Sequence, residues 1–225
     1  MTKKVSVAIL GSTGFVGLEL VKILSKHPNV NIVFFGTENN PDTFLKDIDP
    51  TIKIYDNSLT QLNEHFHHTS VDTVFMALPH GVSHNYVKSF YNKLQIIDLS
   101  ADFRLDDIEV YKKNYNEGHS ASNLLSEFQY GLVEINRNVL INKKNIAVPG
   151  CYPTSVLIPL IPLLENSFID SKNIIIDSKS GYSGAGKKFD LKNIKRSDDY
   201  NFFNYNTNSH RHICEINQEL IKHTK

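Results

Sequence analysis

The segment VSVAILGSTGFVG constrains the fold more than any other part of this sequence. The apolar run Val5–Leu10 predicts a buried strand, and Phe15–His27 has the apolar spacing of a helix. Gly11, Gly14 and Gly17 mark the turn and the start of the helix, with the spacing G-x-x-G-x-x-G. Such glycines let the backbone approach a pyrophosphate, which the helix N-terminus then holds. The segment predicts a dinucleotide-binding turn; a glycine-rich turn without a ligand is the alternative.

Short apolar runs and helical patterns continue to alternate along the first two thirds of the chain. This alternation predicts an α/β fold, a doubly wound parallel sheet with helices on both faces, as in Rossmann-like nucleotide-binding domains. Residues 101–120 are polar and aromatic and predict a surface excursion. The further strands are expected at 31–38, 51–56, 71–79, 95–100 and 145–150, with helices at 59–65 and 82–93.

A change of pattern near residue 150 predicts two domains. Residues 1–149 are expected to form the dinucleotide-binding domain, and residues 150–225 an incomplete α+β catalytic domain. Pro159 and Pro162 lie inside a helical pattern and are expected to kink or split that helix. The second domain is expected to contain this helix at 152–167, a strand from 173 that enters a glycine-rich loop, and a final helix from 210.

Composition excludes several classes of protein. Lys+Arg and Asp+Glu are both 24, and this balance gives no reason to expect nucleic acid or an anionic membrane surface as a partner. The densest apolar run, Val156–Leu164, is too short to span a bilayer. Two cysteines do not form a disulfide framework. A cytoplasmic protein is therefore expected.

Cys151 follows a predicted strand and precedes a predicted helix in the stretch VPGCYPTS. A helix N-terminus favours the thiolate, which is the nucleophilic form of cysteine. The alternative is a small buried residue, which is the more common use of a lone cysteine and the expected use of Cys214. His210 and His212 suit a general acid or base beside a thiolate. A metal site is not expected, since no cluster supplies further ligands.

Two other features bear on phosphate and cofactor binding. The loop SGYSGAGKK, Ser180–Lys188, suits a phosphate but also reads as a flexible loop. Glu38 follows the second strand, where an acid usually binds the ribose hydroxyls of NAD. Thr37, Asn39 and Asn40 are alternative partners for a phosphate. The residues alone leave the choice between NAD and NADP open.

Seven motifs occur in the order known from one family: GSTGFVG, ALPHG, DLSADFRL, YGLVEINR, PGCYPTS, SGYSGAGKK and HRHICEI. On these motifs the chain resembles the N-acetyl-gamma-glutamyl-phosphate reductases of arginine biosynthesis, which belong to the semialdehyde dehydrogenase superfamily. YGLVE departs mildly from the family's YGLPE. Family members are also longer, so the resemblance implies that the second domain is incomplete at its C-terminus.

The resemblance implies an NADPH-dependent oxidoreductase that reduces a small-molecule acyl phosphate, N-acetyl-L-glutamyl 5-phosphate, to the 5-semialdehyde through a cysteine thioester. It implies that Cys151 is the nucleophile and His210 the acid/base, with His212 as the second candidate. Self-association is common in the family, so a homo-oligomer is expected. By motif position, the cofactor-binding residues are Gly11, Ser12, Thr13, Gly14, Phe15, Val16, Pro79 and Gly184, and the substrate-binding residues are Arg104 and Arg211.

Two alternatives remain open at this point. The same chemistry serves a carrier-protein-bound aminoadipyl phosphate in lysine biosynthesis, although the neutral net charge slightly disfavours docking to an acidic carrier. A shortened chain is alternatively a non-catalytic, NADP-binding remnant. The presence of both Cys151 and His210 argues against this second alternative.

Overall fold

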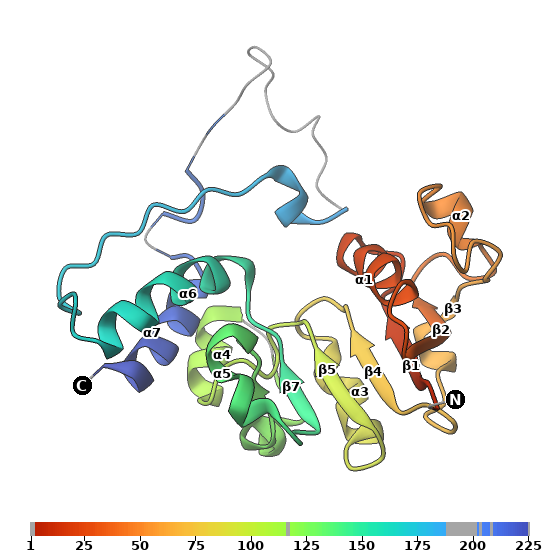
Figure 1. Ribbon diagram of the computed structural model, residues 1–225, viewed down its shortest axis with the longest axis horizontal. Coiled ribbons are helices and arrows are strands. Elements are labelled where there is room, and N and C mark those ends of the chain that lie inside the picture. The colour runs from red at the N-terminus through yellow and green to blue at the C-terminus, as the bar shows by residue number, and fades with distance from the viewer. Residues whose placement is uncertain (1–2, 116–117, 188–201, 203, 208, 225) are drawn as a thin grey trace. The chain divides into compact units, whose positions relative to one another are not determined.

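The structure is a computed structural model that describes residues 3–115, 118–187, 202, 204–207 and 209–224 (Figure 1). The chain divides into two compact units, Met1–Pro149 and Gly150–Lys225. Each unit is described separately below.

Unit 1 contains a seven-stranded sheet in which every neighbouring pair of strands is parallel. The strand order is β3-β2-β1-β4-β5-β7-β6, so the direction of winding reverses between β1 and β4. Ligands of open α/β sheets bind at this reversal, outside the carboxyl ends of the strands. The predicted doubly wound sheet is confirmed. The strands are β1 (Val5–Leu10), β2 (Val30–Thr37), β3 (Gln61–Leu62), β4 (Thr73–Met76), β5 (Gln95–Asp98), β6 (Gln129–Tyr130) and β7 (Asn145–Ala147).

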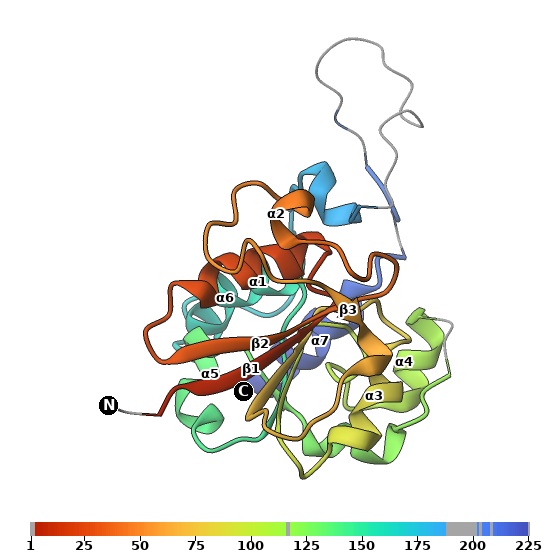
Figure 2. The ribbon, with the colours of Figure 1, turned by 90° about the vertical axis from the view of Figure 1, so that its right-hand side faces the viewer.

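Helices cover both faces of this sheet (Figure 2). No helix in the described part of the chain is long and apolar enough to cross a membrane. The helices of unit 1 are α1 (Phe15–Ser25), α2 (Leu45–Ile48), α3 (Ser83–Phe90), α4 (Ile108–Tyr115) and α5 (Val133–Leu140), with 3-10 turns at Asn63–His65 and Ser122–Glu127.

Alternate residues of β1 belong to two separate apolar clusters. Val7 and Ile9 are buried in a cluster that includes Leu18 of α1. Ala8 and Leu10 are buried in a cluster that includes Val87 of α3. Because successive side chains of a strand point to opposite faces, β1 must be apolar throughout to fill both clusters. This explains why the sequence predicted β1 correctly.

The predicted strand at 51–56 is wrong, and so is the helix predicted at 59–65. Ile52 is buried against the cluster beside α1, but it lies in a loop. The hydroxyl of Tyr55 accepts the N–H of Ile32 at 3.1 Å, so a side chain takes the backbone donor that a neighbouring strand would need. The strand next to β2 is instead the short β3, followed by the 3-10 turn.

The described part of the predicted surface excursion, residues 101–115 and 118–120, contains core residues, so this prediction is wrong. Phe103 stacks on Phe128 with ring centroids 3.9 Å apart, and Tyr111 of α4 is fully buried. The polar side chains of Asp102 and Arg104 are also buried, because they form hydrogen bonds inside the unit. Internal hydrogen bonding therefore allows a polar sequence to lie in the core.

Unit 2 is built on α6 (Cys151–Glu165) and α7 (His212–His223), with a 3-10 turn at Tyr182–Ala185. The helix α6 continues through Pro159 and Pro162, so the predicted split does not occur. The strand predicted from residue 173 is also wrong: residues 173–178 are not in a strand, and the side chain of Ile175 is 94% exposed. The last residue of the predicted glycine-rich loop, Lys188, lies outside the described residues.

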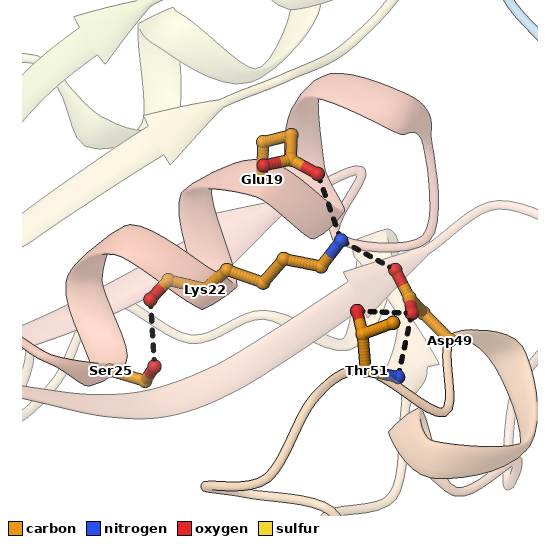
Figure 3. A network of polar contacts seen from close by, with 5 residues as sticks. All are labelled: Glu19, Lys22, Ser25, Asp49 and Thr51. Atoms are coloured by element: carbon orange, nitrogen blue, oxygen red, sulfur yellow. Dashed lines mark hydrogen bonds and ion pairs between the residues drawn. The ribbon is translucent and has the colours of Figure 1, made fainter.

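An ionic network joins α1 to the residues after α2 (Figure 3). The Lys22 ammonium lies 2.8 Å from both Glu19 and Asp49. Thr51 also donates its N–H and hydroxyl to Asp49, at 2.9 and 2.6 Å. The hydrogen bond from Lys22, followed by those from Thr51, lowers the pKa of Asp49 to about 2. The charged network therefore fixes α1, which begins at the glycine-rich turn.

We predict that Asp98 makes the stability of the fold dependent on pH. Asp98 ends β5, and burial together with the nearby Asp102 raises its pKa from 3.8 to about 6. The folded chain then binds a proton that the unfolded chain has lost, so stability falls as pH rises from about 4 to 6 and is constant above. In urea unfolding, the difference in free energy of unfolding between Asp98→Asn and the wild type should shift by about 3 kcal/mol in favour of the variant as pH rises across this interval.

Asp72→Asn provides a matched control, because it makes the same change at an exposed carboxylate. A constant difference in stability between wild type and Asp98→Asn from pH 4 to 7 would contradict the assignment.

Candidate active site

The glycine-rich turn between β1 and α1 has backbone contacts that no larger residue permits. Gly11 has φ of 75°, and a Cβ at this position would lie 2.3 Å from the carbonyl oxygen of Ala77. A Cβ on Gly17 would lie 2.1 Å from the carbonyl oxygen of Gly11. At Gly14 the nearest atom is at an ordinary 3.5 Å. Two of the three glycines are thus required by packing, whereas Gly14 leaves open space at the helix start.

The start of α1 is suited to an anion. Gly14 is its N-cap and contributes no side-chain cap, and the first turn contains no acidic residue. The side chains of Phe15 and Val16 are 45% and 54% exposed. The first N–H groups of a helix have no partner within the helix and carry its positive dipole end. The glycine-rich turn has no space for side chains at Gly11 and Gly17 but is open at the helix start. This arrangement fits the pyrophosphate of a dinucleotide.

Ser12 and Thr13 attach the turn to β2. The buried Ser12 donates its N–H and its hydroxyl to the carbonyl oxygen of Gly36, at 2.7 and 2.9 Å. The hydroxyl of Thr13 lies 2.9 Å from that of Thr37, which also accepts the N–H of Asn40. These predicted cofactor residues therefore also hold the turn in place.

Glu38 is exposed directly after β2. A shallow cavity of about 370 Å³ lies near this end of the sheet. An acid at this position in dinucleotide-binding sheets usually accepts the ribose hydroxyls, but Glu38 is not among the residues that line this cavity. The cavity is lined by Pro41, Asp42, Leu59, Gln61, Leu62 and His65.

The remaining predicted cofactor residues belong to different units. Pro79 is exposed in the loop after β4 of unit 1. Gly184 is exposed in the 3-10 turn of unit 2. The structure of each unit by itself does not bring these two residues together.

Arg104 lies inside unit 1. Its side chain is largely buried, and its Nε and Nη2 donate to the carbonyl oxygens of Val148 and Leu99, both at 2.7 Å. These carbonyls follow β7 and β5. Arg104 therefore has a structural role at the carboxyl ends of two strands, which the sequence did not reveal.

Cys151 is the first residue of α6 and is exposed. The preceding residue, Gly150, is the N-cap, and its N–H donates to the carboxylate of Glu215 at 2.9 Å. Thr154 donates its N–H and its hydroxyl to the carbonyl oxygen of Gly150, at 2.9 and 2.8 Å. The residue before the thiol is thus fixed on both sides, and Glu215 ties it to α7.

Both predicted histidines lie beside Tyr152, the residue that follows Cys151. The ring of Tyr152 meets those of His210 and His212 with centroids 5.1 and 6.1 Å apart. The hydroxyl of Tyr205 lies 3.1 Å from Nε2 of His210. The sequence did not identify Tyr152 or Tyr205; the position of Tyr152 next to the cysteine was the one available signal.

Two family descriptions match the chain consecutively. The first, semialdehyde dehydrogenase NAD binding domain, matches residues 6–143, and the second, semialdehyde dehydrogenase dimerisation domain, matches residues 151–225. The first match covers more than half of the chain. The chain belongs to the semialdehyde dehydrogenase family.

The resemblance to one branch of this family is also confirmed. The N-acetyl-gamma-glutamyl-phosphate reductase of Caldicellulosiruptor bescii is 43% identical over 216 residues, which are 96% of this chain and 63% of the relative. The enzyme of the same name from Ehrlichia ruminantium is 42% identical over 229 residues, covering 98% of this chain and 64% of the relative. The chain therefore spans less than two thirds of the length of these relatives.

Solved structures support the fold of this semialdehyde dehydrogenase chain. Aspartate semialdehyde dehydrogenase II from Vibrio cholerae superposes with a TM-score of 0.58 at 18% identity. The superposition covers 83% of this chain and 49% of that one. At this identity the likeness shows the fold alone.

The neighbours of His210 determine its protonation. Its Nδ1 accepts the N–H of His212 at 3.2 Å, so the neutral ring carries its proton on Nε2, facing Tyr205. Burial, with a further contribution from the charge of Arg211, lowers the pKa of His210. Burial, the hydrogen bond with Tyr152 and the negative charge of a Cys151 thiolate raise the pKa of Tyr205.

The second cysteine has a different environment. The thiol of Cys214 is half-buried and donates to the carbonyl oxygen of Arg211 at 2.9 Å. Burial raises the pKa of Cys214, which disfavours its thiolate. Cys214 is therefore a packing residue of α7 and a suitable control for Cys151.

We predict that Arg211→Gln raises the pKa of His210 toward its ordinary value, because the repelling charge is removed while burial remains. Arg211→Lys keeps the charge and should leave the pKa lowered. An NMR titration of the His210 ring protons measures both. Identical titration curves for all three chains would show that Arg211 does not affect this histidine.

Proposed function

We propose that this chain catalyses the NADPH-dependent reduction of N-acetyl-L-glutamyl 5-phosphate to N-acetyl-L-glutamate 5-semialdehyde and phosphate, in arginine biosynthesis. The observation that carries the proposal is the exposed Cys151 at the start of α6, with His210 packed against the adjacent Tyr152. The similarity to reductases of this name supports the choice of substrate.

We assign cofactor binding to unit 1. The turn from Gly11 to Val16 would hold the pyrophosphate at the start of α1. The family motifs imply a role near the nicotinamide for Pro79 of unit 1, and separately for Gly184 of unit 2. When bound, the nicotinamide cofactor supplies the hydride. Glu38 is the residue of this chain that most directly affects the preference between NADP and NAD.

In the first step, the Cys151 sulfur forms a bond to the acyl carbon, and the bond from that carbon to the phosphate oxygen breaks. Phosphate leaves with the electron pair, and a thioester remains. The sulfur lies at the first residue of α6, the end at which the helix dipole is positive. Backbone N–H groups of the same helix start are suited to stabilise the oxyanion that forms on the carbonyl.

After reduction of the thioester carbonyl, the enzyme carries a thiohemiacetal on Cys151. Its hydroxyl proton passes to a base, the C–S bond breaks, and the sulfur leaves with the electron pair as the aldehyde is released. His210 is our candidate for this proton transfer, because its lowered pKa keeps the ring neutral at physiological pH. The proton would be accepted by Nδ1, which would first release the N–H of His212. His212 is the second candidate, and Arg211, exposed at the N-cap of α7, is a candidate anchor for the substrate.

We further propose that the active protein is a homo-oligomer, since residues 151–225 match a dimerisation domain. A reducing, cytoplasmic location would keep both cysteines as thiols, which the mechanism requires of Cys151.

The proposal predicts phosphate-dependent reduction of NADP⁺ when N-acetyl-L-glutamate 5-semialdehyde is added. Cys151→Ser should lower the rate by about 1,000-fold or more, because the thioester can no longer form. Cys214→Ser should keep most of the activity and controls for damage to unit 2. Activity of Cys151→Ser within about tenfold of the wild type would exclude the thioester route.

A further inference from the structure

We infer that Asp102 is a positioning residue for dinucleotide binding: its carboxylate fixes the loop after β4, residues 77–82, which faces the nicotinamide half of the cofactor. The inference rests on the proposed function, because it concerns the same cofactor site. Asp102 belongs to the DLSADFRL motif, to which the mechanism above assigns no step.

The carboxylate of Asp102 holds two backbone amides of unit 1. Its Oδ1 accepts the N–H of Gly81 at 2.7 Å, and its Oδ2 accepts the N–H of His84 at 3.1 Å. His84 lies in the first turn of α3, whose N-cap, Val82, has no side chain able to cap. Asp102 therefore caps α3 from a different element, with a negative charge at the positive end of the helix.

Other hydrogen bonds orient Asp102 itself, which is fully buried. The hydroxyl of Tyr111 donates to Oδ1 at 2.8 Å. The N–H of Asp102 donates to the hydroxyl of Ser100 at 3.1 Å. Nε2 of His119 donates to its carbonyl oxygen at 2.8 Å, while Nδ1 of that ring accepts the N–H of Ala121. A residue held by several bonds can in turn hold the loop in one geometry.

The loop that Asp102 holds, residues 77–82, lies against the glycine-rich turn between β1 and α1. The N–H of Ala77 donates to the carbonyl oxygen of Leu10 at 2.9 Å, and the Ala77 oxygen occupies the space that a side chain on Gly11 would need. Gly81, at the other end of the loop, has φ of 79°. The loop thus borders the reversal point between β1 and β4, and any shift of it changes the surface beside the turn.

The two halves of a dinucleotide lie on opposite sides of this reversal point. The acidic residue after β2, Glu38, marks the side for the adenosine ribose, so the side of β4 receives the nicotinamide half. The exposed Pro79 lies on the loop on that side. Loss of the Asp102 carboxylate should therefore weaken binding of the nicotinamide half and leave the adenosine half bound as before.

The test compares two ligands on the 225-residue chain: NADPH, and 2′-phospho-ADP-ribose, which lacks the nicotinamide ring. Asp102→Asn replaces one accepting oxygen by an amino group and should weaken NADPH about tenfold, as measured by cofactor fluorescence. The affinity for 2′-phospho-ADP-ribose, measured by calorimetry, should change by less than about twofold.

Asp72→Asn is the matched control, because that carboxylate also accepts a backbone N–H, from Ser6 at 2.8 Å, but at the start of β4. It should change neither affinity. Tyr111→Phe removes one bond to Asp102 and leaves both bonds to the loop, so a loss of about threefold for NADPH alone is expected. This variant decides the question if Asp102→Asn does not fold.

Three results would overturn the inference. One is an unchanged affinity for NADPH in a folded Asp102→Asn chain or, if that chain does not fold, in Tyr111→Phe. Another is an equal loss for both ligands, which indicates general damage to unit 1. The third is a wild-type chain that binds neither ligand, which would also overturn the proposed function. If the wild type binds both ligands, a negative result for the variants contradicts this inference alone and leaves the proposed function standing.

Discussion

The backbone contact between the turn after β1 and the loop after β4 is the constraint on which unit 1 depends. At Gly11 and Gly17 there is no space for a side chain, so the turn can pack directly on Ala77 and on itself. This packing brings the start of α1 to the reversal point of the sheet, where a dinucleotide binds. The buried carboxylate of Asp102 holds the other side of the same contact through Gly81 and His84.

In unit 2 a buried carboxylate likewise fixes the backbone, next to the thiol of Cys151. The backbone before Cys151 is fixed by Glu215 of α7, a fully buried carboxylate that accepts the N–H of Gly150. The helix that begins with His212 thereby holds the helix that begins with Cys151. In both units, a buried acid accepts backbone N–H groups from another part of the chain and so fixes the backbone beside the candidate site.

The sequence predicted the features that depend on local pattern. Continuous apolar runs such as Val5–Leu10 identified central strands, because these strands are buried on both faces. Edge structure was predicted poorly: the strand expected at 51–56 is a loop in which the hydroxyl of Tyr55 binds an amide of β2. The burial of Asp102, and the contact of Tyr205 with His210, depend on partners that a local pattern does not contain. The motifs identified Cys151 and both histidines as candidate site residues, but they did not predict the hydrogen bonds and ring contacts that position these residues.

The most direct test of the account is detection of the acyl group on Cys151. The chain is incubated with N-acetyl-L-glutamyl 5-phosphate, generated by a kinase with ATP, in the absence of NADPH, and is then quenched in acid and mapped by mass spectrometry. The account predicts an N-acetylglutamyl adduct on the peptide that contains Cys151, removable by hydroxylamine as expected for a thioester. An unmodified Cys151, or an adduct on Cys214 alone, would contradict it.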